Sequence, residues 1–209
     1  MKYYLNLIFR PSLYSTQGNR FNAKAVLLVY IAISLVGGVI SIPLALQDPA
    51  LIGFDRTFII TILAGAILFS YFVAAAIYLV QIAGSTVLID SSSPKPSLKE
   101  VTRIYILSLV PYMVYSLLLT FIYLLFIPLV YLDGSFYVAY NIFSTLVICT
   151  TPIFMIWSYY IIVAAIKSYY KTTTGNAVLS GCLPVLVLYF LIFLCGVMFS
   201  VLFTLLLLA

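Results

Sequence analysis

The sequence predicts an all-α protein, a polytopic membrane helix bundle with five transmembrane helices. The chain of 209 residues is 65% hydrophobic and 7% charged, with a mean hydropathy of +1.23, whereas soluble domains carry about 25% charged residues. Its apolar residues fall into five runs, each long enough to cross a bilayer, which takes about 20 residues. The lysines and arginines lie between these runs or at their ends. A bundle of five spans follows from these observations.

Residues 1–24 form a basic segment that we expect to lie at the membrane interface, ahead of a spanning domain at residues 25–209. The segment contains no acidic residue and four basic ones, Lys2, Arg10, Arg20 and Lys24. Pro11 lacks an amide hydrogen, so it should reset the helical phase there. A frayed tail is the alternative. A secretory signal peptide is not expected, because the two arginines interrupt the start of the chain.

The first two spans are expected at residues 25–46 and 57–89. The second has 33 residues, which at 1.5 Å each give about 50 Å against a hydrocarbon core of about 30 Å. No proline or turn cluster divides it, so we expect one helix that projects beyond the bilayer near residues 81–89. Gln81 lies near that end, where its amide should reach water.

The third span is expected at residues 103–132 and follows a linker rich in serine and proline at residues 90–96. Ser97 and Glu100 match a capping box, which predicts that a helix starts there. Pro111 should bend this helix against a packed neighbour, because proline frees a backbone carbonyl that another group must satisfy. A functional hinge at this proline is the alternative.

The last two spans are expected at residues 136–166 and 177–208, and they form a helical hairpin. Lys167 and Lys171 suit the C-terminus of the first helix, and the threonines with a Gly-Asn pair at residues 172–176 should break that helix and cap the next. Pro152 and Pro184 lie inside these two spans. Together with Pro111 they are the candidate hinges.

Charge asymmetry provides a separate check on the number of spans. Placing successive loops on alternate sides brings the N-terminal tail, the 90–103 linker and the 167–171 segment together, with nine of the ten lysines and arginines; only Arg56 falls on the other side. The positive-inside rule then predicts a cytoplasmic N-terminus and an outside C-terminus. We expect the protein to lie in the cell (plasma) membrane. The candidate surface for a partner or for lipid headgroups consists of Arg10, Arg20, Lys24, Lys95, Lys99, Arg103, Lys167 and Lys171.

The sequence offers little for catalysis, and we predict no catalytic residue, no metal site and no cofactor. Histidine is absent, so the commonest general base and metal ligand is missing. The five acidic residues lie in loops or first helical turns, and the three cysteines, Cys149, Cys182 and Cys195, lie inside apolar runs. Nucleic-acid binding is not expected, because the basic residues adjoin apolar runs, where anionic headgroups are the natural partner.

Several short motifs resemble the Yip1-domain family, in particular its prokaryotic members. They are IFRPS at residues 8–12, LKEVTR at 98–103 leading into a span with Pro111, WS at 157–158, AIK at 165–167, and GNAV at 175–178 followed by Pro184. The resemblance implies a five-span membrane protein without catalytic activity. Eukaryotic members act in vesicle traffic and associate with small GTPases and with one another; some prokaryotic members are thought to accompany ABC-type export transporters. This chain lacks the D-L-Y-G-P type motif of eukaryotic members, and no active-site residue is implied.

These observations predict a non-enzymatic scaffold or accessory subunit in membrane organisation, trafficking or transporter-associated export. Its expected partners are the lipid bilayer and either a membrane protein, for example an ABC-type transporter, or a second copy of itself. The alternative is a small transporter or channel subunit with a path lined by the proline-bearing spans three to five. A lipid-modifying intramembrane enzyme is a third reading, and it needs a nucleophile and a base that the apolar spans do not supply.

Overall fold

A computed structural model describes residues 2–45, 55–90, 94–132 and 136–208, and these residues form helices with no β-strand among them. Within these ranges, five helical segments are long and apolar enough to cross a membrane. They are α3 (Ala23–Ala45), α4 (Arg56–Leu88), α5 with α6 (Leu98–Ser108 and Val110–Leu132), α7 (Phe136–Tyr170) and α8 (Thr174–Leu208). The predicted all-α, five-span fold class is confirmed.

The N-terminal segment consists of four short helical pieces. They are α1 (Lys2–Phe9), η1 (Pro11–Leu13), α2 (Tyr14–Gln17) and η2 (Gly18–Arg20). The helix ends before Pro11 as predicted, because Pro11 starts a new turn and cannot continue the old one. The pieces η1 and α2 pack against α7, so this segment is held to the bundle and is not a frayed tail.

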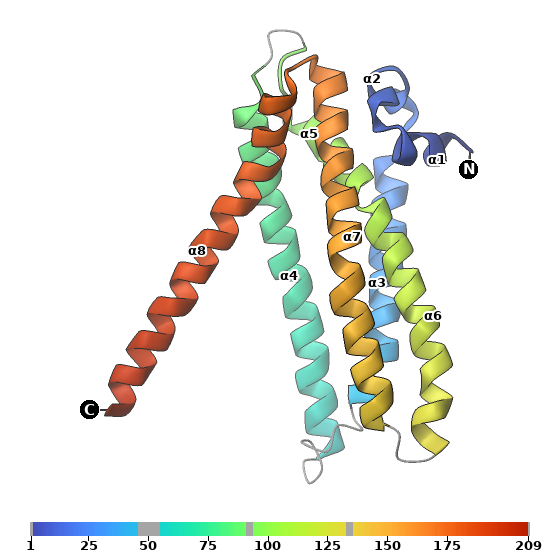
Figure 1. The fold of residues 1–209 in the computed structure, drawn as a ribbon, viewed down its shortest axis with the longest axis vertical. Coiled ribbons are helices and arrows are strands. Elements are labelled where there is room, and N and C mark those ends of the chain that lie inside the picture. Colours follow the sequence, from blue (N-terminus) through green and yellow to red (C-terminus); the bar gives the residue numbers. More distant parts are fainter. Residues whose placement is uncertain (1, 46–54, 91–93, 133–135, 209) are drawn as a thin grey trace.

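The spanning helices form two groups, which α5 and the direct packing of α7 against α8 connect (Figure 1). In one group α6 packs against both α3 and α7; in the other, α4 packs along α8. The short helix α5 contacts α3, α4 and α7. Toward its C-terminus α8 diverges from the other helices (Figure 1), and all four residues at 191–194 are exposed. In a bilayer these apolar side chains face lipid, so their exposure carries no penalty.

The three basic segments lie at one end of the bundle, which we call the basic end (Figure 1, top). The N-terminal segment, the start of α5 and the α7–α8 turn all meet there, while Arg56 begins α4 at the opposite end. The alternate-side assignment made from the sequence therefore agrees with the fold. That the basic end faces the cytoplasm stays a prediction.

The third span differs from the expected single helix over residues 103–132. It is interrupted at Leu109, whose amide donates to the Ile106 carbonyl (3.2 Å) as α5 ends. The cause is Pro111, two residues later, which cannot donate to the carbonyl four residues before it. The Ser158 hydroxyl of α7 donates to the Ser108 carbonyl at this break (2.7 Å). The predicted bend against a packed neighbour is confirmed.

The remaining spans agree with the sequence apart from their ends. The second is one helix of 33 residues, as expected, whereas α7 continues to Tyr170 and α8 begins at Thr174. The expectation for Gln81 is wrong. Gln81 is buried, on a helix that packs against α5 and α8.

Candidate functional site

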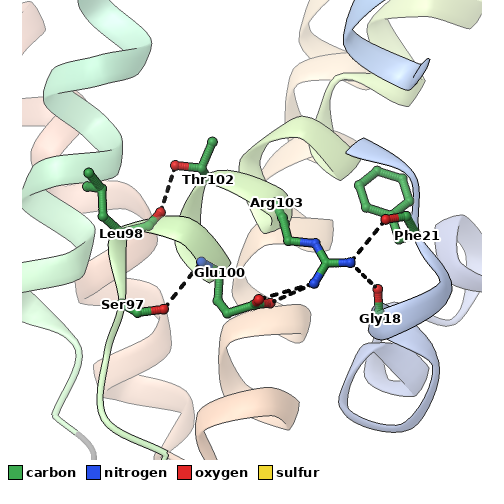
Figure 2. Close-up of polar contacts among 7 residues, drawn as sticks. All are labelled: Gly18, Phe21, Ser97, Leu98, Glu100, Thr102 and Arg103. Carbon is green, nitrogen blue, oxygen red and sulfur yellow. Dashed lines mark hydrogen bonds and ion pairs between the residues drawn. The ribbon is translucent and has the colours of Figure 1, made fainter. Parts of the chain in front are cut away.

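The basic end is the part of the protein where the polar interactions concentrate, and Arg103 is at its centre (Figure 2). Its guanidinium donates to the carbonyl oxygens of Gly18 (3.0 Å) and Phe21 (3.1 Å) in the N-terminal segment. It also pairs with the Glu100 carboxylate one turn earlier on α5 (3.1 Å). Arginine suits this position because its planar fork can serve several acceptors at once. One side chain therefore ties α5 to a segment more than 80 residues earlier.

Local capping places Arg103 at the right point on α5. The Ser97 hydroxyl accepts from the Glu100 amide (3.4 Å), which starts the helix where the capping box predicted. The Thr102 hydroxyl donates back to the Leu98 carbonyl (2.7 Å) within the same first turns (Figure 2). Because the helix start is fixed, the register that directs Arg103 toward the N-terminal segment is fixed as well.

Apolar burial holds the N-terminal segment to the same place. Leu7, Tyr14 and Phe21 are almost fully buried, and each such side chain contributes about 1.5–3 kcal/mol when it is removed from water. The Phe9 ring lies 5.5 Å from the Trp157 ring, centroid to centroid, and Tyr14 makes an edge contact with Tyr169 of α7. The segment is thus a packed part of the basic end.

Tyr14 is buried beside the Arg103 contact without a polar role of its own. Its hydroxyl has no hydrogen-bond partner among the residues that the structure describes. Burial raises the pKa of Tyr14 above its ordinary value of 10.0; the Glu100 carboxylate acts in the same direction and Arg103 opposes it. Tyr14 is therefore neutral at physiological pH and acts by packing.

A second polar cluster joins α4, α5 and α8. The Ser85 hydroxyl lies 2.6 Å from the Tyr105 hydroxyl and donates to the Ser180 carbonyl (2.6 Å). The Tyr105 hydroxyl also lies 3.3 Å from the carbonyl oxygen of Gly181. Ser85 and Tyr105 are buried, where such bonds hold geometry firmly because leaving a partner unpaired is costly. The cluster fixes the start of α8 against the end of α4.

Asn176 completes this junction at the α7–α8 turn. Its side-chain amide donates to the Leu88 carbonyl at the end of α4 (3.1 Å), and its oxygen accepts from the Asp90 amide (3.1 Å). A little deeper, a Cβ at Gly84 would lie 2.9 Å from two ring carbons of Pro184. This spacing is too short for a real Cβ, so only glycine allows α4 and α8 to approach so closely.

The predicted surface cations fall into two groups. Seven have exposed side chains, namely Arg10, Arg20, Lys24, Lys95, Lys99, Lys167 and Lys171. Arg103 differs, because its side chain is 19% exposed and its guanidinium is used inside the protein. The structure thus places seven of the eight cations where a partner or headgroups can reach them and gives Arg103 a structural contact.

The three candidate hinge prolines occupy different settings. Pro111 is buried behind the α5–α6 break, and Pro184 is buried against Gly84. Pro152 is exposed, and α7 continues through it as one helix. The Thr150 and Thr151 hydroxyls beside it bond to the carbonyls of the preceding turn and to the Tyr115 hydroxyl. Pro111 and Pro184 therefore serve packed junctions.

The chemistry available at the basic end suits anion binding and helix assembly. Within the described ranges no three cysteine, aspartate or glutamate side chains lie close enough to hold a metal. Glu100 pairs with Arg103 at the basic end, and at the opposite end Asp55 caps α4 by accepting from the Thr57 amide (3.0 Å). Cys149 is an exposed thiol and Cys182 a half-buried one. Asp48, Asp133 and the side chain of Cys195 lie outside the described residues.

Sequence reasoning missed the contacts that join distant segments. Nothing near Arg103 in the sequence indicates the carbonyls of Gly18 and Phe21, and nothing near Ser85 indicates Tyr105. A polar side chain inside an otherwise apolar run was the available signal, since such groups require a partner in lipid. Ser85, Ser158 and Ser180 all have this character, and all three bond between helices or to their own turn.

Comparison with known proteins supports the resemblance seen in the sequence. The Yip1 domain matches residues 5–195, nearly the whole chain. No curated protein and no solved structure matches. The matched range includes the N-terminal segment, α5 and the α7–α8 turn, which are the parts that meet at the basic end. The chain belongs to the Yip1-domain family.

Proposed function

We propose that the protein is a scaffold or accessory subunit that presents its basic end to a membrane-protein partner and to anionic headgroups. Membership of the Yip1 family and the five apolar helices support a non-enzymatic role in a membrane. The finer assignment, to membrane organisation, trafficking or transporter-associated export at the plasma membrane, is part of this proposal. An ABC-type transporter or a second copy of the chain is the expected partner.

One observation carries the proposal: the basic end is a packed platform that displays charge. The N-terminal segment is held by buried side chains and by Arg103, while seven cations remain exposed around it. Rigid placement of charges lowers the entropy lost when a partner binds, and complementary charge speeds and orients the encounter. Such a surface suits recognition of a protein or a membrane.

The test compares charge removal at the two ends of the bundle. The full chain is crosslinked in its native membrane, solubilised gently and purified, and its partners are identified by mass spectrometry. Lys95→Gln with Lys99→Gln should reduce partner recovery at least several-fold, whereas Arg56→Gln at the opposite end should leave it unchanged. Recovery of only the lone polypeptide from the wild-type membrane contradicts the proposal.

One observation favours the second candidate, a small transporter or channel subunit. A cavity of about 360 Å³ lies between α3, α4 and α6 and is lined by several hydroxyl groups, among them those of Ser34, Ser70 and Thr120. Of spans three to five it involves only the third, so it departs from a path through all three. This candidate predicts solute flux in liposomes that falls when Ser34 and Thr120 are replaced by valine, and when Pro111 or Pro152 is replaced by alanine.

A further inference from the structure

Two hollows on the surface of α7 adjoin each other and differ in chemistry. The upper one, about 640 Å³, lies at the basic end between η1, α7 and the start of α8. The lower one, about 450 Å³, lies between α7 and α8 at the level of the spans. Tyr160 and Val163 line both hollows. The two therefore form one continuous groove that runs from the basic end into the membrane level.

The upper hollow has the chemistry of an anion site. Its polar lining consists of two lysines, at 167 and 171, and of five residues with a hydroxyl group, Ser12, Tyr160, Ser168, Thr172 and Thr174. No acidic residue lines it among those that the structure describes. Thr174 begins α8, whose first-turn amides and dipole also favour a negative group. The lysines are exposed, so a phosphate can approach them from the headgroup layer.

The lower hollow has the chemistry of a hydrocarbon slot. Its lining is almost entirely apolar or aromatic, with Met155, Ile156 and Tyr159 on α7 and Val185, Leu186 and Tyr189 on α8. From Val163 to Met155 the helix rises about 12 Å at 1.5 Å per residue. One leaflet of the hydrocarbon core is about 15 Å deep. The slot thus has about the length of one leaflet.

We propose that this groove binds one anionic phospholipid, with its phosphate between Lys167 and Lys171 and an acyl chain between α7 and α8. A free phosphate does not fill the apolar slot, and a zwitterionic lipid gains less from the paired lysines. The lysines and the slot together therefore select a lipid with net negative charge. The acyl chain gains little by leaving other lipid tails. Selectivity between lipids therefore comes from the headgroup, and the acyl chain in the slot fixes where the lipid lies.

The backbone at Lys171 strengthens the assignment. Its φ is 51°, in the left-handed region that glycine adopts easily and other residues rarely do. A lysine there costs conformational energy that glycine avoids. The variant Lys171→Gly should make the turn easier to form while it removes the charge, so a loss of lipid in this variant cannot be attributed to misfolding.

The headgroup is tested by native mass spectrometry of the purified full chain in detergent with equal phosphatidylglycerol and phosphatidylcholine. Wild type should retain phosphatidylglycerol preferentially. Each lysine near a charged membrane surface is worth about a fivefold factor, so Lys167→Gln with Lys171→Gln should reduce the preference about 30-fold and Lys171→Gly about 5-fold. The control Arg56→Gln removes an exposed cation at the opposite end of the bundle and should leave the preference within about twofold of wild type.

The slot is tested by filling it. Ile156→Trp places a large ring where Ile156 lines the lower hollow and should reduce retained phosphatidylglycerol several-fold. Ile153→Trp is the matched control, because Ile153 is also an exposed isoleucine of α7 but does not line the hollow. Equal retention in the two tryptophan variants overturns the placement of the acyl chain.

Competition distinguishes a lipid from a free anion. Glycerol 3-phosphate and inorganic phosphate at the concentration of the lipid should not displace phosphatidylglycerol. If either does, the groove is a phosphate site and the lipid proposal is wrong. The lipid proposal is also wrong if both lysine variants keep the wild-type preference for phosphatidylglycerol. Partner recovery in the crosslinking experiment is a separate readout, so the scaffold role and the lipid site can fail independently.

Discussion

Removing the Arg103 guanidinium should loosen the N-terminal segment without unfolding the bundle. In Arg103→Ala the carbonyls of Gly18 and Phe21 lose charged donors at 3.0 and 3.1 Å. Hydrogen bonds to charged groups contribute about 1.5–3 kcal/mol each. The Arg103 side chain is 19% exposed, so water can replace part of the lost hydrogen-bond energy. We expect a net loss of about 2–3 kcal/mol.

A loss of this size should raise the open fraction of the segment about 30- to 150-fold. Trypsin reports it, because Arg20 is exposed while Phe21, on the far side of the scissile bond, is buried. Cleavage after Arg20 in detergent should accelerate by that factor when opening limits access. The buried Leu7 and Tyr14 should keep the segment attached most of the time.

Two variants separate the carbonyl contacts from the ion pair. Glu100→Gln removes only a pair one turn apart on α5, worth about 0.2–0.5 kcal/mol, so cleavage should change about twofold. Arg103→Lys keeps the charge but loses the fork and should fall between wild type and alanine. Cleavage of Arg103→Ala at the wild-type rate refutes this account of how the segment is held.

Three further predictions concern the junctions. Gly84→Ala should destabilise the α4–α8 pair by about 1–3 kcal/mol in detergent unfolding, because the new Cβ meets the Pro184 ring at 2.9 Å; Gly65→Ala, with open space at its Cβ, should not. Ser158→Ala should cost about 1 kcal/mol by leaving the Ser108 carbonyl without its donor. Tyr14→Phe should be neutral or stabilising at pH 7. The pKa of Tyr14 is raised from 10.0 in the folded state, so the wild-type protein should lose stability as the pH rises above 10. The variant should lack this part of the loss, because phenylalanine does not titrate.

Local signals in the sequence predicted the local features well. Ser97 and Glu100 predicted the start of α5, Pro11 predicted a new helical phase and Pro111 a bend, because capping and the missing proline amide act within one turn of the chain. The number of spans followed from length and charge. Such features depend on the residue and its immediate neighbours, so one sequence is enough to find them.

The contacts between helices could not be predicted, and the membrane explains why. In water, an apolar stripe along a helix shows which face packs inward. Here the lipid-facing side is as apolar as the packed side, so Phe69 and Phe72 of α4 are exposed while Ile82 on the same helix is buried. Helix faces then have to be recognised from small or polar residues such as Gly84 and Ser85. The burial of Gln81 could not be predicted for the same reason, because the sequence does not show which face of α4 is packed.

The polar junctions gather at one end of the bundle, and this asymmetry bears on function. Ser85, Tyr105 and Asn176 bind α4, α5 and α8 together at the basic end, whereas the C-terminal half of α8 diverges and leaves apolar side chains open (Figure 1). Hydrogen bonds fix geometry, while apolar surfaces in lipid exchange neighbours at little cost. A rigid charged end and an adaptable apolar end are what a subunit needs if it holds one partner in register at the headgroup level and accommodates different lipid or protein surfaces deeper in the membrane.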